Sequence, residues 1–415
     1  MTETAAKAEA STKPAPGTGH LGQTFLVGEE VYIRAIEPAD SAYGQSWTRT
    51  ILPRSTERYE KWIKEEMTKA RHQATYIILR KSDDVAVGSL TTRRWDPVTE
   101  VMPWVDPLSG ERGQRWLAEA LGMAIPWLVD EQQRPIVKIH VGADQQAVIV
   151  ALNEIGAFET VRFREMLRTW GGRTDLFLFE YLNRHWVDRL GDPRDVTLEQ
   201  SGTGEPRPVP APVTLDGDPP ANAVKVGQRV YLRPIEKKDA PQIARWTRQE
   251  TETFWDAGRW MYSTHGYAAW ETDQQKKDPR TSVNFAVCLR ANDELLGTLG
   301  IDGVDYVHGF AETGSLINRP EYRGAGYGSE AKHLLFDYAF NTLNLHALQS
   351  FVIYPNTRSA AALRKQGYQE AGRLHWDFAS FGKFENFVCF DLLASDWRQM
   401  PRADFVAADL DEERA

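Results

Sequence analysis

The chain repeats itself, and this repeat constrains its fold more than any other feature of the sequence. Residues 27–37 read VGEEVYIRAIE, and residues 226–236 read VGQRVYLRPIE, an offset of 199. The same offset joins Trp-Thr-Arg at 47–49 to Trp-Thr-Arg at 246–248. Because so many matches in register do not arise by chance, the sequence predicts two domains of similar structure.

The offset between the two copies increases along the chain. It reaches 211 where Leu152 and Gly156 match Leu363 and Gly367. Most of the increase comes from nine additional residues in the second copy, within residues 249–266. The second copy therefore has an insertion that the first copy lacks.

A proline-rich segment separates the two copies. Residues 201–220 contain six prolines and three glycines, a composition typical of an extended, solvated linker that does not pack. The predicted organisation is a disordered tail at 1–22, a first domain at 23–190, a linker at 191–222, a second domain at 223–400 and an acidic tail at 401–415.

Both copies show the same succession of predicted elements. An alternating strand opens each copy, and a helix around the Trp-Thr-Arg sequence follows. Two paired strands come next. A long helix (111–129 or 329–343), a strand (136–141 or 347–353), a helix (145–155 or 358–366) and a closing hairpin complete each copy. The pattern predicts an α/β (α+β) fold in which each domain has a mixed, mostly antiparallel sheet flanked by helices.

Composition argues against several classes of protein. A net charge of −9 argues against a nucleic-acid-binding protein, which needs a basic face. No run of about 18 apolar residues is present, so we expect no membrane partner. Cys288 and Cys389 lie in apolar strand-like runs and are interpreted as buried thiols of a cytoplasmic protein. The nine histidines form no pair at metal-ligand spacing, so no metal site is predicted.

A glycine-rich run in the second copy carries the clearest functional signal. Residues 323–328, RGAGYG, stand between a predicted strand at 311–317 and a predicted helix that begins at Ser329. Glycines let backbone N–H groups approach an anion, and a helix that begins there points its positive dipole end at the same place. The run predicts a pyrophosphate site, with plain turn chemistry as the alternative interpretation.

The second copy resembles the GCN5-related N-acetyltransferases (GNAT), and among them the RimJ/RimL-like branch of ribosomal-protein N-terminal acetyltransferases. The resemblance covers residues 226–398 and, more faintly, the first copy. It rests on RGAGYG, which matches the family signature Arg/Gln-x-x-Gly-x-Gly/Ala, and on Asn356 with Ser359 three residues later.

The resemblance implies acetyl-coenzyme A (acetyl-CoA) as cosubstrate, bound in a cleft between two splayed strands and attacked directly by an amine. The backbone of Leu316 and Asn318 would hold the pantetheine arm. Holding a thioester against an amine supplies much of the rate by proximity, so few catalytic side chains are needed. The residues implied to bind the cofactor are Leu316, Asn318, Arg323, Gly324, Ala325, Gly326, Tyr327, Gly328, Ser329 and Asn356.

Two proton transfers remain for catalytic side chains. Glu312, on the strand that enters the cleft, is the first candidate for accepting the amine proton, and a solvated strand-face carboxylate is the alternative. Glu385 and His375 are lesser candidates for the same role. Many relatives protonate the thiolate with a Tyr seven residues after the Asn, but this chain has Leu363 there. The branch suggests Ser359 instead, with a helix N-cap as the alternative.

The expected acceptor is an amine of low pKa. Deprotonating a lysine-like amine at pH 7 costs about 4.6 kcal/mol, against about 1.4 kcal/mol for an α-amino group. A peptide α-amino group or a small-molecule amine is therefore favoured. Trp255, Trp260 and Tyr262 of the insertion are candidate substrate-binding residues, with packing of these aromatic side chains as an equal alternative.

The first copy departs from the glycine signature. The offset of 211 places Arg115 at the position of Gly326, where its side chain would enter the space of the phosphates. Gln145 and Val148 fall at the positions of Asn356 and Ser359. We therefore expect an intramolecular pseudo-dimer with one acetyltransferase site, in the second copy, and leave further oligomerisation open. The alternative is a non-catalytic protein that uses the fold to bind CoA or another ligand.

Overall fold

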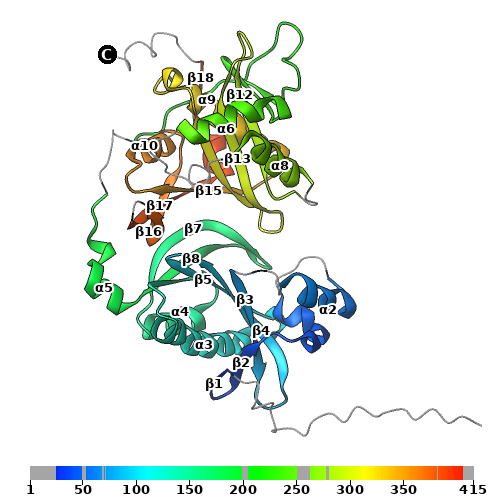
Figure 1. The fold of residues 1–415 in the computed structure, drawn as a ribbon, viewed down its shortest axis with the longest axis vertical. Coiled ribbons are helices and arrows are strands. Elements are labelled where there is room, and N and C mark those ends of the chain that lie inside the picture. Colours follow the sequence, from blue (N-terminus) through cyan, green and yellow to red (C-terminus); the bar gives the residue numbers. More distant parts are fainter. Residues whose placement is uncertain are drawn as a thin grey trace, which may run out of the picture. The chain divides into compact units, whose positions relative to one another are not determined.

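The computed structural model describes residues 25–48, 53–67, 70, 72–198, 204–249, 262–276, 280–380 and 382–404. The chain divides into two compact units. Unit 1 comprises residues 1–158 and 178–190, and unit 2 comprises residues 159–177 and 191–415. Each unit contains a sheet and flanking helices, so the predicted mixed, mostly antiparallel fold is confirmed (Figure 1). The expected tail at 1–22 lies outside the described residues.

The sheet of unit 1 has the strand order β1-β2-β3-β4-β5-β6-β8. The strands of this part of the chain are β1 (Leu26–Val27), β2 (Val31–Ala35), β3 (Gln73–Arg80), β4 (Val85–Trp95), β5 (Val98–Val105), β6 (Ile136–Gly142), β7 (Phe158–Thr169) and β8 (Gly172–Leu182). The helices are α1 (Gly44–Trp47), α2 (Thr56–Glu65), α3 (Gly110–Pro126), α4 (Gln146–Glu154) and α5 (Arg184–Leu190). β5 and β6 pair in parallel, whereas the pairs from β1 to β5 are antiparallel.

The sheet of unit 2 has the strand order β7-β16-β17-β15-β14-β13-β12-β11-β10. Its strands are β10 (Lys225–Val226), β11 (Val230–Pro234), β12 (Val283–Leu289), β13 (Leu295–Asp305), β14 (Phe310–Ile317), β15 (Ala347–Ile353), β16 (Gln369–Ser380) and β17 (Lys383–Leu393). Its helices are α6 (Ala240–Gln249), α8 (Thr264–Gln275), α9 (Tyr327–Asp337), α10 (Thr357–Lys365) and α11 (Ala394–Gln399). Again one pair, β14 with β15, is parallel.

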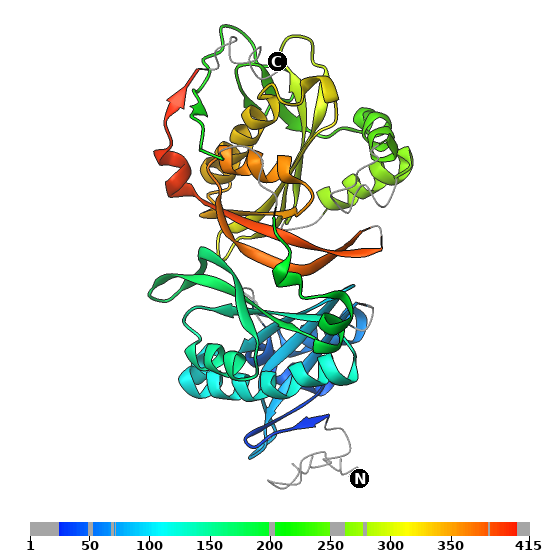
Figure 2. The ribbon, with the colours of Figure 1, turned by 90° about the vertical axis from the view of Figure 1, so that its left-hand side faces the viewer.

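Side-chain alternation along the strands explains the two helical layers of unit 2. Val230 and Leu232 of β11 belong to the core under α9 and α10, whereas Tyr231 between them packs with α6 and α8. Successive side chains of a strand point to opposite faces of a sheet. Figures 1 and 2 accordingly show α6 and α8 on one face of this sheet and α9 and α10 on the other.

The same buried ion pair stands near the start of each unit. Arg34 on β2 donates to both carboxylate oxygens of Asp40 at 2.8 and 2.7 Å. Arg233 on β11 makes the same two bonds to Asp239, at 2.7 and 2.8 Å. Each aspartate also accepts a bond from a backbone N–H three residues earlier. The repeated sequence therefore encodes a repeated contact as well as a repeated strand.

In each unit, a glutamate on the long helix accepts a hydrogen bond from the turn between the first two strands. Glu119 of α3 accepts from the backbone N–H of Glu30 at 3.0 Å. Glu330 of α9 accepts from the backbone N–H of Arg229 at 2.8 Å and from the Arg229 guanidinium at 2.9 Å. These bonds align α3 with α9 at an offset of 211 residues.

Part of the proline-rich segment is packed, contrary to the expectation of a solvated linker. β9 (Val209–Pro210) pairs in parallel with β18 (Arg402–Ala403). The N–H of Arg207 also donates to the carbonyl of Lys365 at 2.8 Å. Val209 is 3% exposed and joins the core of unit 2. The segment packs because its non-proline residues supply backbone donors and this apolar side chain.

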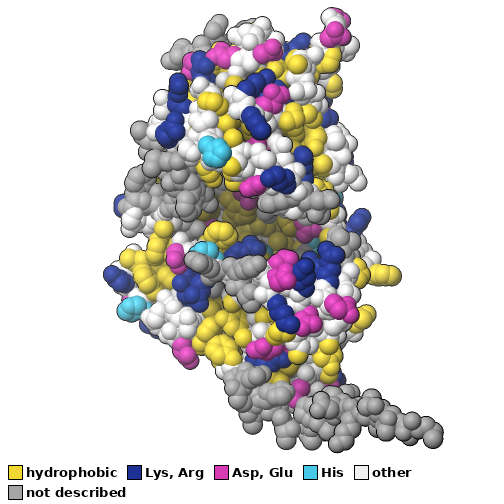
Figure 3. Space-filling view, turned by 45° about the vertical axis from the view of Figure 1, so that its right-hand side comes forward, with side chains coloured by type: hydrophobic (Ala, Val, Ile, Leu, Met, Phe, Trp, Pro, Cys, Tyr) yellow, Lys and Arg dark blue, Asp and Glu magenta, His cyan; other side chains and the backbone are white. Residues whose placement is uncertain are grey.

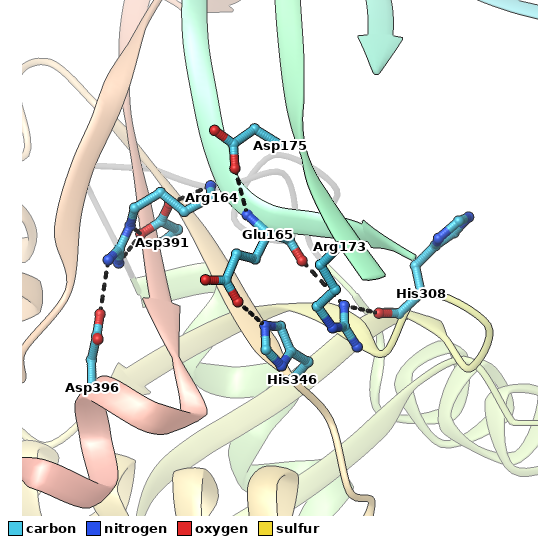
Figure 4. Close-up of polar contacts among 8 residues, drawn as sticks. All are labelled: Arg164, Glu165, Arg173, Asp175, His308, His346, Asp391 and Asp396. Carbon is cyan, nitrogen blue, oxygen red and sulfur yellow. Dashed lines mark hydrogen bonds and ion pairs between the residues drawn. The ribbon is translucent and has the colours of Figure 1, made fainter. Parts of the chain in front are cut away.

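Residues 159–177, which we expected in the first domain, belong to unit 2. Arg164 of β7 donates to Asp391 on β17 and to Asp396 on α11, at 2.9 Å each. Glu165 Oε2 lies 2.8 Å from His346 Nε2, and Arg173 donates to the carbonyl of His308 at 2.8 Å (Figure 4). Several polar contacts therefore hold this hairpin segment to unit 2.

Charges of both signs are mixed on the molecular face in Figure 3. Among the described residues, no helix is long and apolar enough to cross a membrane. Cys288 and Cys389 are both buried, as predicted, and among the described residues neither forms a disulfide.

The helix glutamates provide a matched test of the fold. Glu330→Ala removes the acceptor of a backbone N–H and of a guanidinium, and we expect a loss of about 3 kcal/mol of stability. Glu119→Ala exposes backbone donors that lie close to solvent, so we expect a loss of about 1 kcal/mol. Urea denaturation of the two variants measures the difference. Equal losses would contradict the stronger role assigned to Glu330.

Candidate functional site

Two neighbouring strands of unit 2 separate and leave an open strand edge. β14 pairs with β15 only over residues 310–312, opposite residues 347–349. Beyond this point β14 stays paired with β13 as far as Ile317, and β15 stays paired with β17 as far as Ile353. Within the described part of the chain, residues 314–317 therefore have a strand partner on one edge alone. Such an edge binds an extended ligand through main-chain hydrogen bonds.

Side chains join the two strands at the apex of this opening. Ser350 Oγ donates to the carbonyl of Thr313 at 3.0 Å. The hydroxyls of Thr313 and Tyr368 lie 2.6 Å apart, and burial raises the pKa of Tyr368. The strands are thus connected at one level and diverge after it.

The glycine run forms the loop that leads into α9. Gly324 and Gly326 have φ angles of 80° and 78°, a left-handed conformation that favours glycine. Gly326 immediately precedes the helix, and no side chain caps the first helical turn, residues 327–329. The N–H groups of a first turn have no acceptor inside the helix. They and the helix dipole therefore form a site suited to an anion.

Hydrogen bonds hold this loop in place. Arg323 Nε donates to the carbonyl of Ile317 at 2.7 Å, which brings the loop to the end of β14. Arg229 donates to the carbonyl of Ala325 at 3.0 Å, and Ala325 is 2% exposed. The candidate cofactor residues from 316 to 329 are thereby brought together at one end of the open edge.

One of these residues has less of its backbone available than expected. The N–H of Asn318 donates to the carbonyl of Leu296 on β13 at 2.9 Å. Only the carbonyl and the side chain of Asn318 remain for a pantetheine arm. Leu316 is half-buried and pairs with Thr298 across the β13 edge.

Asn356 caps α10, and Ser359 lies inside the first turn of that helix. Asn356 Oδ1 accepts from the N–H of Ser359 at 3.2 Å. The interpretation of Ser359 as the N-cap is therefore wrong, because the cap is Asn356. Both side chains are half-buried, and the hydroxyl of Ser359 is not needed for the cap.

Glu312 is the last residue of β14 that pairs with β15. Its side chain is exposed, and its neighbours in register are Asp302 on β13 and Gln349 on β15. It therefore stands where the strands begin to separate. The lesser candidates, Glu385 and His375, lie on the β16–β17 hairpin and not on the separating strands.

Of the three candidate substrate-binding aromatics, Trp255 and Trp260 lie outside the described residues. Tyr262 is half-buried just before α8. Its ring centroid lies 5.9 Å from that of Tyr267 and 6.1 Å from that of Trp270. These contacts agree with the packing alternative for Tyr262.

The region of unit 1 that matches the glycine loop is helical. α3 begins at Gly110, so Arg115 and Leu117 lie inside it and not before it. Their backbone N–H groups are used within the helix, and Leu117 is buried. At the other matching position, Val148 is fully buried where unit 2 has Ser359.

Unit 1 has a glutamate in register with Glu312, but an arginine, a lysine and a histidine surround it. Glu100 is the third residue of β5 that pairs with β6, and Glu312 is the third residue of β14 that pairs with β15. Its carboxylate lies 2.7 Å from His140, 3.6 Å from Arg93 and 4.0 Å from Lys138. Burial raises the pKa of Glu100, yet these three contacts outweigh it and hold the pKa far below its usual value. The matching positions in unit 2 are Asp302, Gln349 and Phe351.

Lys332 was not predicted from the sequence as a residue near the site. This residue lies on the face of α9 that packs against the sheet and is 1% exposed. Burial lowers the pKa of Lys332 to about 7, and the nearby charge of Glu312 opposes that change. The signal was present in the sequence, because Ala331, Leu335 and Phe336 mark this helix face as apolar.

Comparisons with known proteins agree with the geometry. A family model described as an acetyltransferase (GNAT) domain matches residues 229–369. An uncharacterized N-acetyltransferase, p20 of Bacillus licheniformis, is 26% identical over 171 residues, which are 41% of this chain and 96% of that protein. Spermidine N(1)-acetyltransferase of Escherichia coli (strain K12) is 28% identical over 169 residues, 38% of this chain and 83% of that protein.

A crystal structure of spermidine N-acetyltransferase from Vibrio cholerae in complex with CoA and spermine is 21% identical. It covers 41% of this chain and 98% of its own chain, with a TM-score of 0.37.

The segment that matches the family model contains the separated strands, the glycine loop, α9 and α10. GNAT acetyltransferases use acetyl-CoA. Residues 229–369 thus match an acetyltransferase (GNAT) domain model, and the chain is an acyl-CoA-dependent acetyltransferase with acetyl-CoA as its cosubstrate.

Proposed function

We propose that this chain transfers acetyl from acetyl-CoA to a primary amine, at one active site in unit 2. The observation that carries the proposal is the open edge of residues 314–317 beside the uncapped start of α9. An extended pantetheine arm and a pyrophosphate require these two features next to each other. The matching part of unit 1 has a helix where the loop would be.

The chain offers groups for each part of acetyl-CoA. Backbone N–H groups from Gly324 to Ser329 would bind the pyrophosphate, aided by the dipole of α9. The free edge of β14 near Leu316 would bind the pantetheine arm. Asn356, at the start of α10, would contact the cofactor again. Bound in this way, the thioester is presented to the amine by position alone, which supplies much of the rate.

The proposed reaction needs two proton movements. The amine nitrogen attacks the thioester carbonyl carbon, and the bond from that carbon to sulfur breaks. Glu312 accepts the proton that the amine loses, directly or through water. Ser359 is the proposed donor to the departing thiolate, and solvent water returns a proton to the Ser359 hydroxyl.

We further infer that the chain arose by duplication of one GNAT unit and that the first copy no longer binds acetyl-CoA in the usual way. The recurring arginine–aspartate pair and helix glutamate support the duplication. The helical residues at 112–117 and the buried Val148 support the loss of the first site. The RimJ/RimL-like branch is proposed on the sequence signature.

The proposed acceptors are α-amino groups and small-molecule amines. Relatives of this chain include spermidine N(1)-acetyltransferases, which act on a small polyamine. An amine of low pKa suits a site whose base is a single carboxylate, because less free energy is needed to remove its proton. A panel of polyamines and peptides with free N-termini, assayed by thiol release, distinguishes the two classes. Tight acetyl-CoA binding without turnover of any amine would favour a non-catalytic binding protein.

Substitutions in the two copies test the single site. Gly326→Val places a β-branched side chain at a left-handed position within the proposed anion site. We expect it to abolish acetyl-CoA binding in calorimetry, because the loop must rearrange. Arg115→Ala, at the matching position of unit 1, is the control and should leave the affinity unchanged. Loss of binding in both variants would contradict a single site in unit 2.

Glu312→Gln tests the proposed base. This change keeps the size of the side chain and removes its ability to accept a proton. We expect kcat/KM for the amine to fall about 100-fold or more, the usual range for loss of a general base. Acetyl-CoA affinity, measured by calorimetry, should not change. An unchanged rate would exclude Glu312 as the base.

A further inference from the structure

α8 borders a pocket on its own face of the unit 2 sheet. The pocket has a volume of about 610 Å³, which is within the usual range of small-molecule sites. Ile235, Ala240 and Ala268 give it an apolar wall, and Tyr267 and Glu271 of α8 add polar groups. Such a lining suits a ligand that has a carbon chain and a small number of polar atoms.

Tyr267 brings a hydroxyl without a partner to this pocket. The residue is 7% exposed, and its ring centroid lies 5.9 Å from that of Tyr262 and 5.6 Å from that of Trp270. Its hydroxyl forms no hydrogen bond with any residue that the structure describes. A hydroxyl that is buried without a bond costs free energy. A polar ligand atom in the pocket supplies the missing bond.

Unit 1 satisfies the matching hydroxyl within its own fold. Tyr59 and Tyr267 each stand four residues after the serine N-cap of their helix. The Tyr59 hydroxyl accepts from Gln45 Nε2 at 3.0 Å. The Trp-Thr-Arg offset of 199 places the fully buried Ala244 at that position in unit 2. Because alanine has no hydrogen-bonding side chain, the hydroxyl of Tyr267 is left for a partner from outside the fold.

Glu271 is a second polar group that unit 1 lacks. It follows Tyr267 by one helical turn and is 7% exposed, whereas Ile63 at the matching position of unit 1 is 3% exposed. Its carboxylate accepts from Gln275 Nε2 at 3.0 Å and from Asn284 Nδ2 at 3.2 Å. Both donors are neutral, and burial raises the pKa of Glu271. A bound cation would favour the ionised carboxylate.

The other charges that line the pocket leave it with an excess of negative charge. Glu236 and Lys237 also line it, so its side chains include two carboxylates and one amine. Glu236 accepts from Asn222 at 2.9 Å and lies 3.2 Å from Lys238. Lys237 is exposed, and its long side chain can keep the ammonium group in water. The pocket therefore favours a cationic ligand.

Polar side chains continue from the pocket across the sheet to Glu312. Asn284 on β12, the partner of the pocket carboxylate, pairs in register with Gly300 on β13. A Cβ on Gly300 would lie 2.9 Å from Asn284 Oδ1 and 3.1 Å from Asp302 Oδ2, so both side chains flank this glycine on one face. Asp302 pairs in register with Glu312 on β14, and paired side chains share a face. Two strand spacings, about 10 Å, separate β12 from β14.

The matching face of unit 1 has no such acidic row. Strand register puts Thr75 and Thr91 in the places of the asparagine and the glycine, and their hydroxyls lie 3.2 Å apart. The same register puts Arg93 in the place of Asp302. A basic side chain thus replaces an acidic one. The pocket and the row belong to the unit that has the proposed active site.

We propose that the pocket of Tyr267 and Glu271 binds the second, protonated amine of a diamine acceptor, while the first amine reacts beside Glu312. This inference rests on the function proposed above and names the acceptor class of that site. Glu271 pairs with the ammonium group, the Tyr267 hydroxyl accepts one of its N–H bonds, and the carbon chain follows the apolar wall. The reacting amine gives its proton to Glu312, and the pocket amine keeps its charge throughout.

A series of diaminoalkanes of increasing length tests the acceptor class. We expect kcat/KM for a long diamine to exceed that for the monoamine of equal chain length by about tenfold or more, because the second ammonium group gains charged hydrogen bonds. The preference should disappear for diamines too short to span about 10 Å. Equal kcat/KM for the monoamine and every diamine would overturn the proposal. A preference for peptides with free N-termini would do the same.

Substitutions in the pocket are tested by binding, which needs no turnover. Tyr267→Phe removes one hydroxyl, and Glu271→Gln removes one charge. In calorimetry on the full-length, CoA-bound protein, each should weaken binding of a long diamine about tenfold. Tyr59→Phe, at the matching position of unit 1, is the control and should leave the affinity unchanged.

Two outcomes of this binding experiment separate the pocket from the function. If the diamine binds Glu271→Gln and Tyr267→Phe as tightly as the wild type, the pocket does not hold the second amine and the proposal is wrong. If binding depends on both residues in a chain that acetylates no amine, the pocket assignment stands and the proposed acetyl transfer is rejected.

Melting temperatures test the unpartnered hydroxyl itself. Tyr59→Phe removes a bonded hydroxyl and should lower the melting temperature, whereas Tyr267→Phe removes an unbonded one and should leave it unchanged or higher. A saturating long diamine should raise the melting temperature of the wild type more than that of Tyr267→Phe. An equal fall in both variants without ligand would show that the Tyr267 hydroxyl already has a partner in the fold, which contradicts the proposal.

Discussion

The separation of β14 from β15 is the constraint on which the rest of unit 2 depends. Parallel pairing lasts for three residues, and at the next level Ser350 Oγ donates to the carbonyl of Thr313 and Thr313 Oγ1 donates to the carbonyl of Gln349. Beyond it, β13 and β17 keep the two strands in their own halves of the sheet. Main-chain groups on the open edge of β14 lack a strand partner there, and such groups are costly to leave unpaired away from water. An extended ligand with its own donors and acceptors satisfies them.

The two units show how small changes remove such a site from the same fold. In unit 2 the chain leaves β14 through two left-handed glycines, and α9 begins at Tyr327. In unit 1 the helix begins at Gly110, and the corresponding backbone donors form intrahelical bonds. Glu100 is neutralised by nearby cations where unit 2 has Glu312. The two units share the course of the backbone. They differ in whether the backbone N–H donors lie inside a helix and in which side chains surround the strand glutamate.

Much of the fold follows from the sequence pattern, because the pattern is local. The strand at 347–353 and the helices around 146–154 and 357–365 form where apolar periodicity and turn residues predict them. The glycine loop is also local, and its conformation agrees with the predicted turn. The packing of Val209 could not be read in this way, since it depends on a strand near residue 402 that is distant in sequence.

The candidate site was harder to predict than the fold because its partners come from separate elements. The backbone of Asn318 was expected to hold the pantetheine arm, but β13 accepts its N–H, and only the folded structure shows this. The N-cap of α10 is Asn356 and not Ser359, a difference of three residues that spacing alone did not resolve. Glu312 was identified from its strand, whereas its electrostatic neighbour lies on a helix beneath the opposite face.

Lys332 illustrates why a polar residue in an apolar helix face is informative. Leu121 at the matching position of unit 1 is 1% exposed, so an apolar side chain fits this place in the fold. Burying an amine there costs free energy that burying the apolar side chain does not. The first unit has neither the open loop nor the buried amine, and its strand glutamate is held by ion pairs.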